Sequence, residues 1–293
     1  MLNKKSKIFI AGHKGMVGSS IKKRLISLGY KNLLLSEKKK LNLLNQKKVY
    51  NFLKKHKPKL VIIAAAKVGG ILANSKFKDK FLYENLQIQN NLIHGSYLAK
   101  IKNLIFLGSS CIYPKNCKQP MKEKYLLTGQ LEETNDAYSI AKIAGLKMCE
   151  YYSQKYRLNY KSLMPPNLYG PNDNYDLENS HFLPALIKKI YIASKKKRNK
   201  VVKLWGTGKP LREVLHVDQV ANACEFFLRK KTDKSLINIG SHVEMTIKDY
   251  ANQIREKIDN SVLIKFDNNK KLDGVKRKKL DLSLAKHYGW KTK

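Results

Sequence analysis

The chain has 293 residues, of which 43% are hydrophobic, and its formal net charge at pH 7 is +37. This length and composition exclude a disordered chain and allow one large domain or two unequal ones, and no apolar run approaches the ~18–20 residues of a membrane helix. Only seven of the 59 basic residues are Arg, and the Lys residues are spread over the whole chain. Nucleic-acid binders instead favour Arg and gather their charge on one face. We therefore expect neither a nucleic-acid nor a membrane partner.

The N-terminus and the cysteines indicate the compartment. The chain passes from lysines directly into a strand-like run and lacks the apolar region of ~7–15 residues that a signal peptide carries. Its four cysteines show neither a disulfide framework nor a metal-ligand spacing, and we expect reduced thiols. The sequence therefore predicts a cytoplasmic protein without a metal site.

Short apolar runs alternate with longer amphipathic stretches over the first two-thirds of the chain. The predicted strands cover residues 7–11, 32–36, 60–65, 104–109 and 160–164. The predicted helices cover residues 16–28, 46–55, 81–100 and 137–156. Continuous apolar strands separated by helices predict an α/β fold, a Rossmann-type doubly wound parallel sheet with helices on both faces.

The pattern changes after residue 165. A long loop is expected over 167–180, a helix over 181–193, a basic loop over 195–200 and a strand over 201–205. A helix over 218–230 and a strand over 236–239 would return to the main sheet, and 246–293 holds one helix, a strand near 262–266 and a basic tail. We therefore expect a large domain of residues 1–165 with about 215–240, and a smaller discontinuous α/β lobe of about 166–214 and 241–293.

Three glycines mark the junction of the first strand and the first helix. Gly12 permits the tight turn, Gly15 lets the backbone approach a pyrophosphate, and Gly18 allows the helix to pack on the strand. The free N–H groups and the dipole at the helix N-terminus favour an anion at this position. The turn therefore predicts a dinucleotide site.

The choice of dinucleotide depends on charges near the second strand. Glu37 lies 19 residues beyond Gly18, where an acidic residue would bind the ribose 2′-hydroxyl of NAD. Lys14 and Lys38 would instead pair with the 2′-phosphate of NADP. The charges favour NADP(H), and NAD remains the alternative.

Tyr138 and Lys142 are four residues apart and lie on one face of a predicted helix. There the ammonium would lower the pKa of the phenol, which would then exchange a proton with a carbonyl oxygen near neutral pH. Such pairs also arise by chance in a chain so rich in Lys. If the strand before them stays extended, Ser109 and Cys111 point the same way, with Ser109 bonding the carbonyl and Cys111 moving a proton beside it.

Several motifs occur in one order along nearly the whole chain. They are G-x-x-G-M-V-G (12–18), A-A-A-K-V-G-G-I (64–71), L-G-S-S-C-I-Y-P-K (107–115), the Tyr138/Lys142 pair, P-P-N-L-Y-G-P-N-D-N (165–174), N-S-H (179–181) and W-G-T-G-K-P-L-R-E-V-L-H-V-D (205–218). Together they closely resemble the GDP-L-fucose synthase family of extended short-chain dehydrogenases/reductases. The resemblance implies NADPH, a homodimer, and GDP-4-keto-6-deoxy-D-mannose as the substrate.

The resemblance also implies roles for individual residues. Cys111 and His181 would be the acid/base pair that epimerises C3 and C5, and Tyr138, with Lys142 and Ser109, would protonate the C4 oxygen as hydride reaches C4. The implied cofactor contacts are Gly12, His13, Lys14, Gly15, Met16, Val17, Gly18, Lys38, Ala65, Lys142, Pro165, Asn167, Leu168 and His181. The implied substrate contacts are Asn167, Lys189, Trp205, Arg212 and Lys278.

Some positions depart from the family pattern or stay open. Lys14 and Lys189 stand where Arg is expected, which keeps the charge but loses the bidentate fork, and Pro166 replaces an expected Thr. For Trp205, packing in the core is an equal alternative to a ligand contact. The nearest rival function is a nucleotide-sugar 4-epimerase or 4,6-dehydratase, although dehydratases usually carry an acidic residue where this chain has Ser110 and Cys111. A basic nucleic-acid-binding Rossmann protein is a remote alternative.

Overall fold

Apolar runs build the central sheet. In the computed structural model, which describes residues 2–177, 180–270 and 273–292, six parallel strands lie in the order β2-β1-β3-β4-β5-β9. Strand β3 is typical of them, since each of its residues is buried, as expected where both faces of a sheet are covered. The strands are β1 (Ile8–Ala11), β2 (Leu33–Leu34), β3 (Leu60–Ile63), β4 (Asn103–Leu107), β5 (Asn159–Met164) and β9 (Leu236–Asn238).

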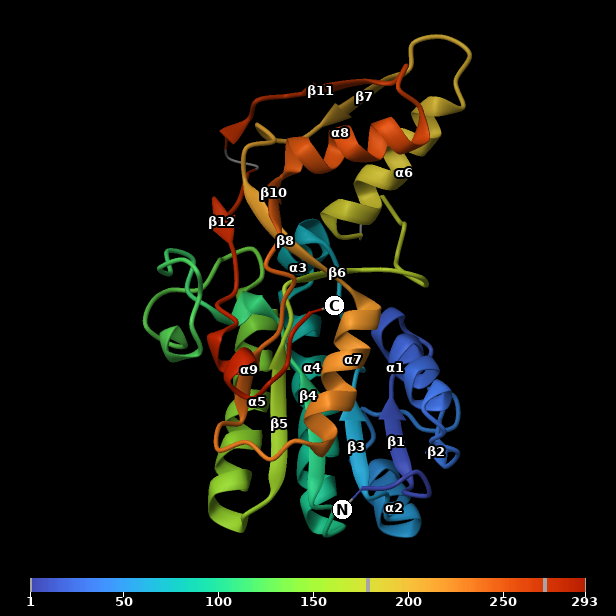
Figure 1. The fold of residues 1–293 in the computed structure, drawn as a ribbon, viewed down its shortest axis with the longest axis vertical. Coiled ribbons are helices and arrows are strands. Elements are labelled where there is room, and N and C mark those ends of the chain that lie inside the picture. Colours follow the sequence, from blue (N-terminus) through green and yellow to red (C-terminus); the bar gives the residue numbers. More distant parts are fainter. Residues whose placement is uncertain (1, 178–179, 271–272, 293) are drawn as a thin grey trace.

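Helices cover both faces of this sheet (Figure 1). Alternate residues of β1 serve different cores: Phe9 packs in the cluster under α2 (Gln46–His56), α4 (Lys78–Leu98) and α5 (Asp136–Tyr156), and Ile10 packs in the other. That other cluster lies under α1 (Met16–Ser27) and α7 (Val217–Arg229). The predicted doubly wound parallel sheet is confirmed.

A smaller lobe stands at the carboxyl end of the sheet strands (Figure 1). Helices α6 (Phe182–Ser194) and α8 (Ile247–Ile258) pack with the parallel strands β7 (Val201–Leu204) and β11 (Leu263–Phe266) around a third apolar core. Strand β8 (Leu211–His216) pairs with β6 (Asn167–Tyr169), β10 (Glu244–Thr246) and β12 (Arg277–Lys278). Because β8 continues directly into α7, these pairings connect the lobe to the sheet.

The last described residues return to the sheet. The short helix α9 (Ser283–His287) and the residues after it pack under β9 and α7, where Ala285, Tyr288 and Trp290 are buried beside Phe227. No helix among the described residues is long and apolar enough to cross a membrane. The four cysteines are free thiols.

The structure corrects several predicted elements. The predicted strand over 32–36 has two residues, β2, and the strand predicted over 104–109 ends at residue 107. The long loop predicted over 167–180 begins with β6 instead, and Asn179 lies outside the described residues. The sequence also did not predict the helices α3 (Ile71–Lys76) and α9, or the 3₁₀ turns η1 (Ser110–Ile112) and η2 (Glu123–Tyr125).

Candidate active site

The glycine turn between β1 and α1 has the shape that a bound phosphate requires. Gly12 has φ +87°, and a Cβ there would lie 2.7 Å from the backbone nitrogen of Ala65. A Cβ on Gly18 would overlap the carbonyl of Gly12, so both positions need glycine. The nearest atom to a Cβ on Gly15 is 3.5 Å away, so the space above Gly15 is open to a ligand. Met16 and Val17 begin α1 there without an acidic residue in its first turn.

A basic cavity of about 740 Å³ adjoins this turn. Its lining residues are His13, Lys14, Ser19, Lys22, Lys23, Ile26, Ser27 and Glu37. Lys14 Nζ lies 2.6 Å from Glu37 Oε1, and this contact, with the charge of Lys14, lowers the pKa of Glu37. Burial and two lysine charges lower the pKa of His13. Lys38 is exposed next to Glu37. The carboxylate is therefore already paired, and a net positive charge remains beside the turn.

The backbone after β4 turns earlier than we expected. Residues Ser110–Ile112 form a 3₁₀ turn, because the Ser110 N–H donates to the Pro165 carbonyl (3.0 Å) and the Ser109 hydroxyl accepts from the Cys111 N–H (3.3 Å). The extended backbone stops at Ser109. The expectation that Ser109 and Cys111 alternate along one extended strand is wrong, and the 3₁₀ turn directs Cys111 toward α5 instead.

Tyr138 and Lys142 lie side by side on α5. Lys142 is buried, its Nζ donates to the Leu107 carbonyl (2.9 Å), and it lies 5.6 Å from the centroid of the Tyr138 ring. Burial lowers the pKa of Lys142 to about 7. Burial, and after it the charge of Cys111, raises the pKa of Tyr138, so the expected lowering of the phenol pKa by Lys142 is wrong in this structure. The phenol keeps its proton until a strong base forms nearby.

Lys278 of β12 interacts with both predicted acid/base residues. Its Nζ is 3.8 Å from the Cys111 sulfur. His181 occupies the N-cap position of α6 without a capping side-chain bond. Although the residue is exposed overall, desolvation of its imidazole and then the charge of Lys278 lower its pKa. The structure therefore brings Cys111 from the sheet and His181 from the lobe to one lysine.

The side chain of Arg212, on β8, bonds to backbone carbonyls. Its guanidinium donates to the carbonyls of Leu211 (3.0 Å), Val275 (2.7 Å) and Asp273 (3.2 Å). Burial lowers its pKa to about 10, while the charges of Cys111 and Asp273 oppose this effect. In this structure Arg212 holds the segment before β12, and it lies within electrostatic reach of Cys111.

Trp205 and Lys189 form a separate pair in the smaller lobe. The Lys189 ammonium lies 4.9 Å from the Trp205 ring centroid, and the Trp205 side chain is 56% exposed. This exposure excludes the alternative that Trp205 packs in the core. The loop after Trp205 is fixed by Asp273, which accepts from the N–H (2.7 Å) and the hydroxyl (2.7 Å) of Thr207.

The remaining predicted residues lie where β5 passes into β6. The Pro165 carbonyl accepts a hydrogen bond from the 3₁₀ turn after β4. Asn167 and Leu168 pair with β8 opposite Val214 and Leu215. The sequence did not predict Asn135, whose side-chain nitrogen is 3.7 Å from the Cys111 sulfur. The signal available was its position, three residues before Tyr138 and directly before the start of α5.

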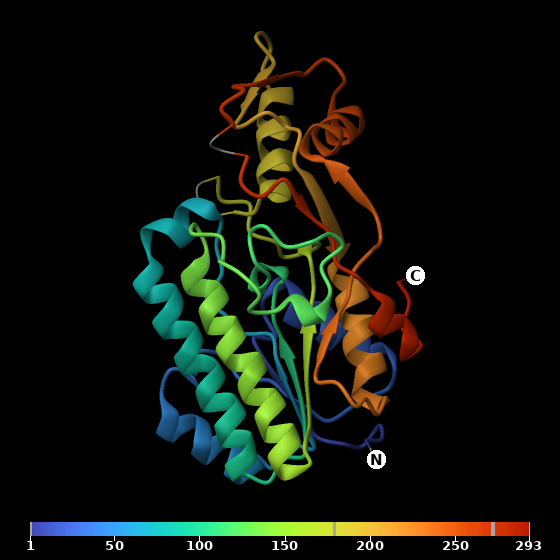
Figure 2. The ribbon, with the colours of Figure 1, turned by 90° about the vertical axis from the view of Figure 1, so that its left-hand side faces the viewer.

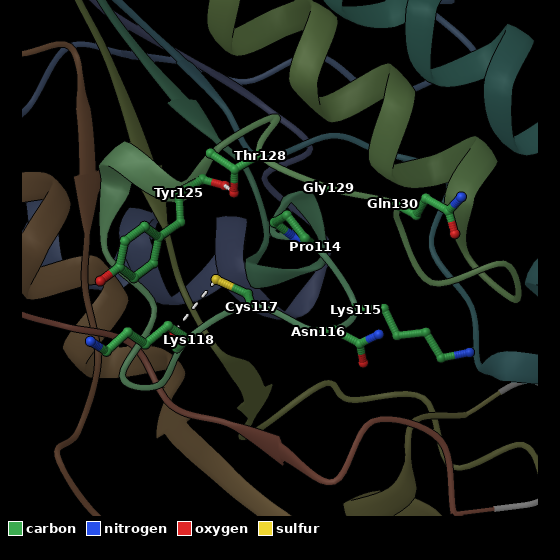
Figure 3. A pocket seen from close by; sticks show the side chains of 9 residues that line it. All are labelled: Pro114, Lys115, Asn116, Cys117, Lys118, Tyr125, Thr128, Gly129 and Gln130. Carbon is green, nitrogen blue, oxygen red and sulfur yellow. Dashed lines mark hydrogen bonds between the residues drawn. The ribbon is translucent and has the colours of Figure 1, made fainter.

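A second cavity, of about 420 Å³, is formed by residues that follow the 3₁₀ turn Ser110–Ile112 in the chain (Figure 3). It is lined by Pro114, Lys115, Asn116, Cys117, Lys118, Tyr125, Thr128, Gly129 and Gln130. Figure 3 shows the side chain of Cys117 among these residues, with Tyr125 and Lys118 to one side of it and Lys115 and Gln130 to the other. No predicted site residue lines this cavity, so it is separate from the site around Cys111.

Comparison with known proteins agrees with this geometry. The model of the NAD dependent epimerase/dehydratase family matches residues 8–240. GDP-L-fucose synthase 1 of Arabidopsis thaliana is 47% identical over 100% of this chain and 90% of its own. GDP-L-fucose synthase of Escherichia coli (strain K12) is 44% identical over 98% of this chain and 91% of its own. The solved structure of MlghC, a GDP-mannoheptose C4 reductase from Campylobacter jejuni with NADP bound, is 36% identical with a TM-score of 0.91, covering 100% of this chain and 95% of that one.

Proposed function

The chain belongs to the NAD dependent epimerase/dehydratase family, and we propose that it makes GDP-L-fucose from GDP-4-keto-6-deoxy-D-mannose with NADPH. The observation that carries the proposal is the position of Lys278, beside the sulfur of Cys111 and within electrostatic reach of His181. Cys111 in turn acts through its charge on Tyr138, which lies beside Lys142, so we infer that the proton-exchanging pair and the reducing pair serve one site. A simple reductase would need only the second pair.

Epimerisation would come first. The C4 ketone acidifies the protons on C3 and C5, so a base can remove each proton and an acid can return one to the opposite face. We assign these steps to Cys111 and His181, which approach the substrate from different lobes. The lowered pKa of His181 keeps its imidazole neutral near pH 7 and able to accept a proton.

Reduction at C4 would follow at the same place. Bound NADPH would supply hydride to C4. The Tyr138 phenol, whose raised pKa keeps it protonated, then donates its proton to the C4 oxygen as negative charge develops there. Lys142 lies beside the phenol, and Ser109 is assigned a hydrogen bond to the same oxygen.

The glycine turn fits the phosphates of this cofactor, because Gly12 and Gly18 let the turn and the helix pack closely and the space above Gly15 stays open. Lys14 and Lys38 are proposed for the 2′-phosphate of NADP, with Glu37 neutralised by Lys14. His13, Gly15, Met16, Val17, Ala65, Pro165, Asn167, Leu168 and His181 are proposed to line the rest of the dinucleotide site. Asn167, Lys189, Trp205, Arg212 and Lys278 are proposed to bind the GDP-sugar.

We also propose a homodimer in the cytoplasm, with no nucleic-acid or membrane partner. Helices α4 and α5 lie side by side with one face toward solvent (Figure 2). That face exposes Tyr83 of α4 with Ile140 and Tyr151 of α5, which a second copy would cover. For the domains, we propose the expected division, except that residues 280–290 join the sheet domain, where they are packed.

The proposal is tested by incubating the protein with GDP-4-keto-6-deoxy-D-mannose and NADPH. We expect loss of NADPH absorbance and a product with the configuration of L-fucose. A 4-epimerase or a 4,6-dehydratase would not consume NADPH, and a reductase without epimerase activity would give a product with the configuration of the starting sugar at C3 and C5. Either of these results would overturn the proposed function.

A further inference from the structure

Asn135 stands at the N-cap of α5 but does not act as a cap. Asn is among the preferred N-cap residues because its side-chain oxygen accepts from an N–H of the first turn. The Asn135 side chain makes no such bond, and its backbone has φ −139° and ψ 19°. Asp136 instead accepts from the N–H of Ala137 (2.7 Å). The capping role is therefore not the reason for an Asn at position 135.

The side-chain amide of Asn135 instead faces the 3₁₀ turn that carries Cys111. Its Nδ2 lies 3.7 Å from the Cys111 sulfur, within hydrogen-bond distance for sulfur. Lys278 Nζ is 3.8 Å from the same atom and comes from the other lobe. Among the described residues, these two side-chain nitrogens lie within hydrogen-bond distance of this sulfur, and only Asn135 stands at the start of the helix that carries Tyr138.

Ser139 fixes this arrangement. It is fully buried, and its hydroxyl lies 2.9 Å from the Cys111 carbonyl, 3.0 Å from the Asn135 carbonyl and 3.2 Å from Asn135 Oδ1. Asn135 and Ser139 are one helical turn apart and therefore lie on one face of the start of α5. A single hydroxyl thus connects the turn that carries Cys111 to the amide that faces its sulfur.

We propose that Asn135, held by Ser139, is a positioning residue for Cys111, directing the sulfur toward the sugar carbon. This inference rests on the proposed function, because it assumes that Cys111 exchanges protons with the substrate. An amide N–H donates to a thiolate more strongly than to a neutral thiol. The hydrogen bond from Asn135 to Cys111 is therefore stronger when Cys111 is a thiolate, the form that accepts a proton. Tyr138 follows on the same helix, so the two proton-transferring groups keep a constant separation.

The substitution Asn135→Asp separates this role from capping. Asp caps a helix as well as Asn does but has no N–H to donate, and its charge opposes a thiolate. A matched control is Asn45→Asp at the N-cap of α2, where Asn45 does cap, accepting from the Lys48 N–H (2.9 Å). If Asn135 only stabilises the helix, Asn135→Asp will behave as Asn45→Asp does, with no loss.

Two readouts are measured on the full-length variants. The first is deuterium exchange from D₂O into C3 and C5 of the keto sugar. We expect Asn135→Asp to slow it about tenfold or more, as for loss of a hydrogen bond to a charged group, with NADPH affinity and unfolding midpoint unchanged. The second is alkylation of Cys111 by iodoacetamide, followed by peptide mass spectrometry, which we expect to slow while Cys117 in the same molecule reacts as before.

Unchanged exchange and unchanged alkylation in Asn135→Asp would overturn the inference. If the wild-type protein does not act on the keto sugar, the proposed function fails, and alkylation still decides whether Asn135 contacts Cys111. If Asn135→Asp does not fold, Ser139→Ala replaces it. That variant keeps both amide and thiol, and we expect a smaller slowing of alkylation at Cys111; no slowing would contradict the inference.

Discussion

The two halves of the site are held in different ways. On the sheet side, Lys142 is buried against Phe106 and the end of β4, and Tyr138 is fixed with it on a long helix. On the lobe side, Trp205 and His181 are exposed and lie outside the helices and strands, directly after β7 and directly before α6. Burial fixes a side chain and shifts its pKa, whereas exposure leaves it free to meet a large ligand. We therefore expect changes on the sheet side to alter chemistry and stability, and changes on the lobe side to alter substrate binding.

The largest effect is expected on the sheet side, from Tyr138→Phe. Removing the phenolic proton donor should reduce NADPH oxidation by about 10²–10⁴-fold, the usual contribution of general acid catalysis. NADPH affinity, measured by fluorescence titration, should stay within about twofold because the ring remains. Activity within tenfold of the wild type would show that another group protonates the C4 oxygen.

Cys111→Ser should slow epimerisation without weakening the binding of NADPH. Because a hydroxyl is a poorer proton-transfer group than a thiol near neutral pH, deuterium exchange at C3 and C5 should fall by about 10²-fold. NADPH affinity should not change. The matched control is Cys117→Ser, in the separate cavity of Figure 3. This variant should catalyse deuterium exchange at C3 and C5 at the native rate. Equal exchange in both variants would remove Cys111 from the mechanism.

Lys142→Met tests whether the buried ammonium destabilises the protein without ligands. The pKa of Lys142 is lowered from 10.5 to about 7, so the unfolded chain binds more protons between these values. The loss of folding stability caused by the buried ammonium is complete below pH 7 and disappears as the pH rises toward 10.5. We expect the variant to lose reductase activity but gain about 1–3 kcal/mol in urea unfolding near pH 6, and less near pH 9. A variant less stable than the wild type at both pH values would contradict this.

The smallest effect on the fold is expected on the lobe side. Trp205→Ala should raise KM for the GDP-sugar about tenfold while changing the free energy of unfolding by less than about 0.5 kcal/mol, as for an exposed residue. Leu263→Ala, at an equally exposed apolar residue of the same lobe, is the control and should leave KM unchanged. A loss of stability in Trp205→Ala without a change in KM would assign the ring to packing.

The sequence predicted the sheet side better than the lobe side, for a physical reason. Buried parallel strands are continuous apolar runs such as Leu60–Ile63, and they can be recognised locally. Strands β6, β10 and β12 have two or three residues each and depend on pairing with β8, which lies far away in the sequence. Such strands have no local pattern long enough to recognise.

The candidate site divides in the same way. Motifs predicted Cys111, Tyr138, Lys142 and His181 as site residues, but not the backbone conformation around them. The 3₁₀ turn at Ser110 depends on the distant Pro165 carbonyl, and the carbonyls that Arg212 binds come from residues 273–275. The raised pKa of Tyr138 reflects burial, which a helical spacing of Tyr and Lys cannot show.

The central claim is that one site joins two proton exchanges to one reduction. The most direct test is nuclear magnetic resonance of the sugar product formed by the wild-type protein from GDP-4-keto-6-deoxy-D-mannose and NADPH in D₂O. We predict deuterium at C3 and C5, from exchange with solvent through Cys111 and His181, and ordinary hydrogen at C4, from NADPH. A reduced product with ordinary hydrogen at C3 and C5, or deuterium at C4, would contradict the account.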